Sequence, residues 1–134
     1  MKAEDKQLLL KDISGRLPYG VICEDMEGKT RPLFGITPTL HFEVTLHNAT
    51  DGTNNGLKFC TIEDIKPYLR PMSSMTEEER IEYAEFLEDI DGYAYSIDCV
   101  PQIDWLNAHH FDFRNLIERG LAIEVTEENN PYKD

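Results

Sequence analysis

Residues 40–47, LHFEVTLH, carry the strongest β-strand pattern in the chain. Apolar and polar side chains alternate throughout the stretch, and successive side chains of a strand point to opposite faces of the sheet. The period of two predicts a half-buried strand with Leu40, Phe42, Val44 and Leu46 turned toward a core. Such a strand needs partner strands and a covering layer, which must come from the sequence on either side.

Shorter β segments flank this strand. Segments 20–24 and 31–37 surround the polar run 25–29, which is typical of a hairpin connection. Residues 57–60 return as a strand after a glycine- and asparagine-rich loop at 48–56. Together these segments predict a small curled, barrel-like antiparallel sheet, whose strand order the sequence does not determine.

Helical patterns lie on both sides of the predicted sheet. Apolar side chains recur at helical spacing over residues 3–17, and Pro18 ends that helix. Three more helices are predicted over residues 76–91, 101–109 and 112–120, the last of them capped by an aspartate and ended by a glycine. The fold class is therefore α+β, with an N-terminal helix, the sheet, and then three helices.

The remaining segments are short. Alternation over residues 92–98 and the apolar run 121–125 predict one or two further short strands. The polar stretch 126–134 is predicted to be a frayed tail. No internal repeat or linker divides the chain, so residues 1–134 are expected to form a single domain.

The charge of the chain is strongly negative and unevenly distributed. The 134 residues carry a net charge of −13. Residues 1–70 hold nine Lys and Arg against ten Asp and Glu, whereas residues 71–134 hold four against sixteen. Because phosphate backbones repel such a chain, direct nucleic-acid binding is not expected, whereas a basic protein is a plausible partner.

The lack of membrane-spanning and signal-peptide features and the spacing of the cysteines predict a cytoplasmic protein. No apolar run approaches the ~20 residues needed to cross a bilayer, and the N-terminus lacks the features of a signal peptide. Cys23, Cys60 and Cys99 are widely spaced and form no C-x-x-C pair. We expect reduced thiols that serve as small apolar residues, with no membrane contact, metal or other cofactor; the sequence indicates no oligomeric state.

The helix at 76–91 concentrates the negative charge. It follows a stiff, extended connection set by Pro67 and Pro71, and Thr76 with Glu79 forms a capping box at its start. Its apolar stripe contains Tyr83, Ala84, Phe86, Leu87 and Ile90. The opposite face is acidic around one apolar side chain, and we expect these residues to form an interaction surface: Glu78, Ile81, Glu82, Glu85, Glu88 and Asp89.

One further cluster could carry chemistry. Asp104, His109, His110 and Asp112 combine imidazoles and carboxylates, which bind metals or act as acids and bases. The spacing argues against a site, because adjacent histidines usually point in different directions and Asp112 is in position to cap a helix. No catalytic residue is therefore assigned.

Three stretches resemble a known family. RLPYGV (16–21), KPYLRPMSSMTEEE (66–79) and DWLNAHHFDFRNLIERGLAIEV (104–125) are similar to short uncharacterised proteins of gut bacteria and their prophages. The resemblance implies an intracellular protein carried on a phage or mobile element. It implies no activity, ligand or site residue.

The sequence leaves three hypotheses of function. The first is a non-enzymatic binding or assembly module that uses the acidic helix face. The second is a nucleic-acid mimic that inhibits a DNA-binding protein. The third is a small hydrolase or metalloenzyme centred on His109 and His110.

Overall fold

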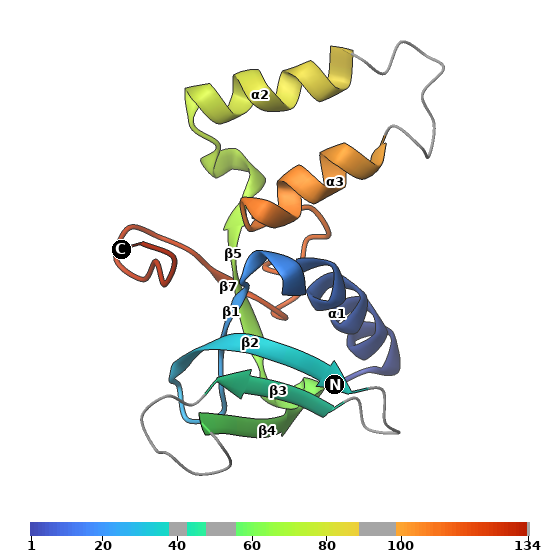
Figure 1. The fold of residues 1–134 in the computed structure, drawn as a ribbon, viewed down its shortest axis with the longest axis vertical. Helices are drawn as coiled ribbons and strands as arrows, with labels where there is room; N and C mark the ends of the chain where they lie inside the picture. The colour runs from blue at the N-terminus through green and yellow to red at the C-terminus, as the bar shows by residue number, and fades with distance from the viewer. Residues whose placement is uncertain (38–42, 48–55, 89–98, 134) are drawn as a thin grey trace.

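The computed structural model describes residues 1–37, 43–47, 56–88 and 99–133. The elements in chain order are α1 (Ala3–Arg16), η1 (Leu17–Tyr19), β1 (Ile22–Glu24), β2 (Thr30–Thr37), β3 (Glu43–His47), β4 (Leu57–Thr61), η3 (Ile62–Asp64), β5 (Lys66–Pro71), η4 (Met72–Ser74), α2 (Glu77–Glu88), α3 (Cys99–Ala108), β6 (Phe111–Asp112) and β7 (Ile123–Glu124). α1 packs beside the sheet, and β5 leads from the sheet to α2 and α3 at the other end of the molecule (Figure 1). The predicted α+β class and N-terminal helix are confirmed.

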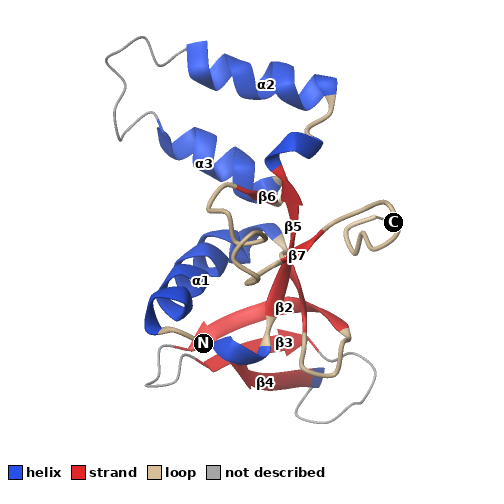
Figure 2. Cartoon of the chain, turned by 180° about the vertical axis from the view of Figure 1, so that it is seen from behind, coloured by secondary structure: helices blue, strands red, loops and turns tan. Residues whose placement is uncertain are grey.

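The sheet is mixed and does not close into a barrel. Its strands follow the order β4-β3-β2-β1-β5-β6, and β7 also pairs with β5. The neighbours from β4 to β5 are antiparallel, whereas β6 and β7 run parallel to β5. The predicted antiparallel arrangement of the first four strands is confirmed, whereas the barrel-like closure is wrong, and the C-terminal segments add parallel strands to β5 (Figure 2).

The predicted strand is confirmed at 43–47, although Thr45, expected on the outward side, is only 7% exposed. In β3, Val44 and Leu46 are fully buried and pair with Cys60 and Lys58 of β4. Leu40 and Phe42 lie outside the described residues, as do the predicted loop at 48–55 and the predicted strand at 92–98.

The main core lies between α1 and the sheet. Leu9 and Ile13 of α1 are fully buried at helical spacing. They meet apolar side chains from the strands and the C-terminal segment, which are Val21, Cys23, Leu33, Val44, Leu46, Cys60, Ile62, Ile65, Leu69, Leu116, Leu121 and Ala122. Cys23 and Cys60 are free thiols within this core, and burial raises the pKa of Cys23 to about 12. Both act as small apolar residues, as expected.

A second, smaller core joins α2 and α3 to β6. Its buried members are Met75, Leu106 and Phe111. Partly buried side chains pack around them, namely Met72, Tyr83, Trp105 and Phe113. The helical end therefore has its own hydrophobic centre next to the α1–sheet core.

Residues 66–71 form the strand β5, where the sequence predicted only a stiff, extended connection set by Pro67 and Pro71. Pro67 pairs with Cys23 of β1, and Pro71 is the last residue of the strand. The two prolines therefore sit near the ends of β5, where missing ladder donors are tolerated. Between them, Leu69 is fully buried and accepts a hydrogen bond from Val125 N.

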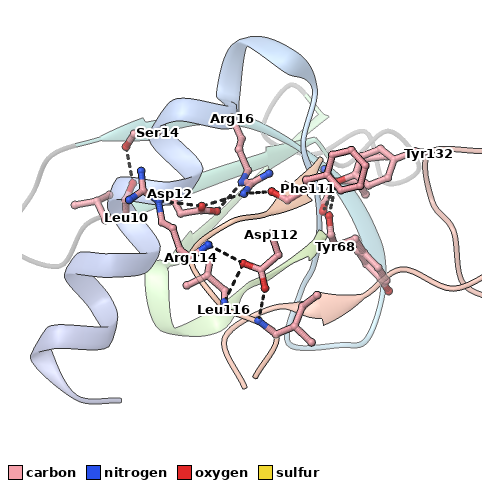
Figure 3. Close-up of polar contacts among 12 residues, drawn as sticks. Leu10, Asp12, Ser14, Arg16, Tyr68, Phe111, Asp112, Arg114, Leu116 and Tyr132 are labelled. Carbon is pink, nitrogen blue, oxygen red and sulfur yellow. Dashed lines mark hydrogen bonds and ion pairs between the residues drawn. The ribbon is translucent and has the colours of Figure 1, made fainter. Parts of the chain in front are cut away.

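The predicted helix at 112–120 is also wrong. Asp112 belongs to β6, and its carboxylate accepts hydrogen bonds from the backbone amides of Arg114, Leu116 and Ile117 (Figure 3). Asn115 has a positive φ of 59°, which an α-helix does not allow. The segment forms turns and not an α-helix, so two α-helices rather than three follow β5 in the described residues.

The tail is folded back onto the sheet, in contrast to the frayed tail predicted at 126–134. The Tyr132 hydroxyl accepts a hydrogen bond from Ile22 N (3.0 Å) and donates to Tyr68 O (2.7 Å), joining β1 to β5 (Figure 3). Its ring stacks on His110, with ring centroids 3.7 Å apart. Nothing in the local sequence signals this docking, because all of its partners are distant in the chain.

Candidate protein-binding surface

The start of α2 is held by a capping box, as predicted. Thr76 N donates to Glu79 Oε1 at 2.9 Å, and Glu79 N donates to Thr76 Oγ1 at 3.1 Å. The same Glu79 carboxylate accepts two hydrogen bonds from the Arg70 guanidinium, at 2.8 and 2.7 Å. The guanidinium also lies over the ring of Phe111, 4.2 Å from its centroid. α2 is thus anchored to the end of β5 and to the second core.

This anchor makes α2 sensitive to acid. Hydrogen bonds from Arg70 lower the pKa of Glu79 to about 2, so folding favours its charged form. This stabilisation is present above the ordinary pKa and is lost as the pH falls from about 4.5 toward 2. We expect Glu79→Gln to lower the free energy of unfolding by about 2–3 kcal/mol at pH 7 and to flatten its pH dependence in this range.

Urea unfolding at pH values between 2 and 7 measures this effect. Glu85→Gln, a change of an exposed glutamate on the same helix, is the control and should leave the curve close to wild type. Identical pH profiles for wild type and Glu79→Gln would contradict the assigned role of Glu79.

One side of α2 packs against α3. The rings of Tyr83 and Phe86 lie 5.7 and 6.2 Å from that of Trp105, centroid to centroid. Gln102 Nε2 donates to the Tyr83 hydroxyl at 2.8 Å, and Trp105 Nε1 donates to Glu82 Oε2 at 2.9 Å. These contacts cover the apolar side of α2 with α3 and leave the other side of α2 exposed to solvent.

The structure places most of the predicted interaction residues on that free side. Glu78, Ile81 and Glu85 are exposed. Glu82 differs, because its bond to Trp105 sets it at the border with α3 rather than at the centre of the acidic face. Glu88 ends α2, but its side chain is not described, and Asp89 lies outside the described residues.

Ile81 is the centre of what we call the α2 acidic face, formed by Glu77, Glu78, Ile81 and Glu85. Its side chain is 59% exposed. The glutamates stand four and three residues before it and four after it, which are the positions that neighbour a residue on a helix surface. Glu77 was missing from the predicted face, although this spacing could have identified it.

This arrangement is suited to binding rather than catalysis. The face presents one apolar side chain within a ring of carboxylates, and the capping box and the contacts with α3 already stabilise the helix without it. An exposed apolar residue with charges around it is the form of an interface centre with a polar rim.

The predicted histidine cluster is only partly assembled, because His109 and His110 line one pocket with Arg70 and Tyr132, whereas Asp104 and Asp112 do not line it. The His109 ring stacks on Trp105 at 4.2 Å, whereas the His110 ring stacks on Tyr132 at 3.7 Å. Asp104 is exposed, and Asp112 is used by the backbone amides that follow it. Across the described ranges, no three His, Cys, Asp or Glu side chains form a group that could hold a metal ion.

His110 packs against the C-terminal segment as a partly buried ring. It lies at the turn after α3 with a positive φ of 64°. Burial, and then the nearby charge of Arg16, lower the pKa of His110 to about 4. The ring is therefore neutral near pH 7 and serves as a flat surface for Tyr132. A neutral imidazole with so low a pKa is a poor general base at that pH.

Comparisons add no relative from which a role could be transferred. No protein-family model, curated protein or solved structure matches the chain. The resemblance at 16–21, 66–79 and 104–125 therefore stays a prediction. Among the helices that the structure describes, none has the length and apolar character to pass through a bilayer.

Proposed function

We propose that this protein is a non-enzymatic intracellular binding or assembly module, of phage or mobile-element origin, that docks a basic protein on the α2 acidic face. The observation that carries the proposal is the exposure of Ile81 among Glu77, Glu78 and Glu85 on a helix that is anchored without them. In this mode, carboxylates steer and orient a Lys- and Arg-rich surface, and Ile81 enters an apolar pocket at its centre.

Charge reversal on α2 tests the proposal. We expect Glu78→Lys/Glu85→Lys to weaken partner binding at least ~10-fold, because two attractive charges become repulsive ones. Glu127→Lys/Glu128→Lys is the matched control, since it changes the net charge equally at exposed positions of the C-terminal segment. Ile81→Ser should weaken binding without changing the net charge.

The measurement has two stages. Quantitative pull-downs from a bacterial lysate compare wild type with the two charge variants, and a candidate must be retained by wild type and the control but lost from the α2 variant. Its affinity is then measured with purified proteins at low and high salt, where binding should weaken as salt screens the charges. A lysate with no protein that discriminates between the two variants contradicts the proposal.

The same purified complex tests nucleic-acid mimicry. If the partner is a DNA-binding protein and the α2 acidic face occupies its DNA site, excess duplex DNA will displace this protein. A complex that survives excess DNA at constant salt excludes mimicry and leaves docking on another basic surface.

A further inference from the structure

β4 forms one edge of the sheet, at the end of the molecule away from α2 (Figures 1 and 2). It pairs with β3 from Leu57 to Thr61, and no strand of the described chain pairs with its other side. An edge strand presents unpaired backbone donors and acceptors, which form a template for another strand.

β4 contains neither a proline nor a lysine that points outward from the strand edge. Edge strands are commonly protected by proline or by an outward lysine. The one lysine of β4, Lys58, donates to Asp25 Oδ2 at 3.0 Å and to Glu27 Oε1 at 3.1 Å. Lys58 is therefore held by carboxylates of the β1–β2 turn, and its charge is largely neutralised there.

Two aromatic side chains beside this edge are exposed to solvent. Phe59 of β4 and Phe34 of β2 are 59% and 52% exposed. Phe59 lies opposite Thr45, the neighbour of Val44, and so points away from the side on which Val44 and α1 pack. Phe34 packs edge-on against the exposed His47 at 5.0 Å between ring centroids. Aromatic side chains therefore remain open to solvent next to an open strand edge.

The charge distribution argues for a second copy of this chain as the occupant. The net charge of −12 on residues 71–134 belongs to the part that contains α2, whereas residues 1–70, which include β1–β4, have a net charge of only −1. Two copies that meet at β4 keep their acidic helices far apart, and their neutral sheet ends do not repel one another. An antiparallel pair of identical edge strands is also self-complementary about a twofold axis.

We propose that two copies associate through their β4 edges, in an antiparallel pairing that continues the sheet across both chains and covers Phe59. The contact surface is separate from the α2 acidic face, so each copy keeps that face free. Because the paired ends carry little net charge and the acidic helices lie far from the contact, salt should change this association much less than it changes the binding of a basic partner.

Sedimentation equilibrium over roughly 5–500 μM protein tests this association at low and high salt. We expect a monomer–dimer equilibrium that Phe59→Ser weakens at least ~10-fold, because the substitution removes apolar area from the interface. Ile81→Ser is the matched control, since Ile81 is also 59% exposed, and it should leave self-association unchanged. Circular dichroism confirms that both variants are folded.

Hydrogen exchange locates the contact. Amides of β4 should exchange more slowly at high than at low protein concentration, whereas those of α2 should not change. A chain that stays monomeric over the whole range, or a dimer that Phe59→Ser leaves intact, overturns the inference. Neither result bears on the binding of a basic protein by α2.

Discussion

Replacing Arg16 with methionine is expected to lower the free energy of unfolding by about 3–5 kcal/mol, because it leaves a buried carboxylate without its main partner. Arg16 is fully buried, and Asp12 is 2% exposed. Arg16 Nε donates to Asp12 Oδ2 at 2.7 Å, and Nη2 donates to Asp12 Oδ1 at 3.1 Å (Figure 3). Methionine retains much of the apolar stem but has none of these donors.

Arg16 also connects distant parts of the fold. Its Nη2 donates to the carbonyl oxygen of Phe111 at 2.6 Å, which joins α1 to β6. Arg114 Nε lies 3.3 Å from Asp12 Oδ1 and partly balances its charge. This remaining cation should prevent complete unfolding of the variant but cannot restore the link to Phe111.

Urea unfolding of three variants separates these contributions. Arg119→Met removes an exposed arginine that lies 3.5 Å from Asp5, and it should change stability by no more than about 0.5 kcal/mol. Asp12→Leu/Arg16→Met removes both buried charges and should recover part of the loss, because an apolar pair needs no desolvated partner. A cost for Arg16→Met as small as that for Arg119→Met would show that the buried pair does not stabilise the fold.

The features predicted correctly from the sequence depend on residues close together in the chain. The β3 alternation, the hairpin around Asp25 and the capping box of Thr76 with Glu79 each involve neighbours within a few positions. Local backbone geometry and side-chain hydrogen bonds determine such elements, so their patterns are visible without tertiary structure.

The features that were missed depend on distant partners. β5 looks like a connector because of its prolines, and it becomes a strand only through pairing with β1, β6 and β7. Tyr132 lies in a polar tail, yet its hydroxyl bonds with Ile22 and Tyr68. The segment after Asp112 has a helix cap, but the left-handed Asn115 allows Leu116 and Leu121 to enter the core instead.

The α2 acidic face also combines features set by neighbouring residues with features set by distant partners. Helical spacing was sufficient to place Glu78, Ile81 and Glu85 on one face. It could not show that Glu82 accepts a hydrogen bond from Trp105, because the position of α3 beside α2 is a tertiary property. The face that remains is narrower than predicted and centred more closely on Ile81.

Replacing Asp25 with alanine is expected to lower the free energy of unfolding by about 3–5 kcal/mol, a range typical of breaking a buried, hydrogen-bonded charge network. The Asp25 carboxylate is fully buried. Its Oδ1 accepts hydrogen bonds from the amides of Glu27 and Lys29 at 2.9 and 3.0 Å, which close the β1–β2 turn. Its Oδ2 accepts from Arg31 Nε at 2.6 Å and from Lys58 Nζ at 3.0 Å, which connect the turn to β2 and β4.

The pH dependence distinguishes charge from packing in this network. Burial alone would raise the pKa of Asp25, but the hydrogen bonds from Arg31, Lys29, Lys58 and Glu27 outweigh it and hold the pKa well below its ordinary value. The charged form therefore stabilises the fold above the unfolded pKa of about 3.9, and this stabilisation is lost as the pH falls further.

Asp25→Asn is the informative second variant, because it keeps the size of the side chain and one oxygen acceptor but removes the charge. We expect it to be less stable than wild type at pH 7 and to lose less stability on acidification, as measured by urea unfolding between pH 2 and 7. Glu27→Gln, at the exposed end of the same network, should have a much smaller effect. If Asp25→Asn matches wild type at pH 7, the turn depends on the shape of the side chain and not on its charge.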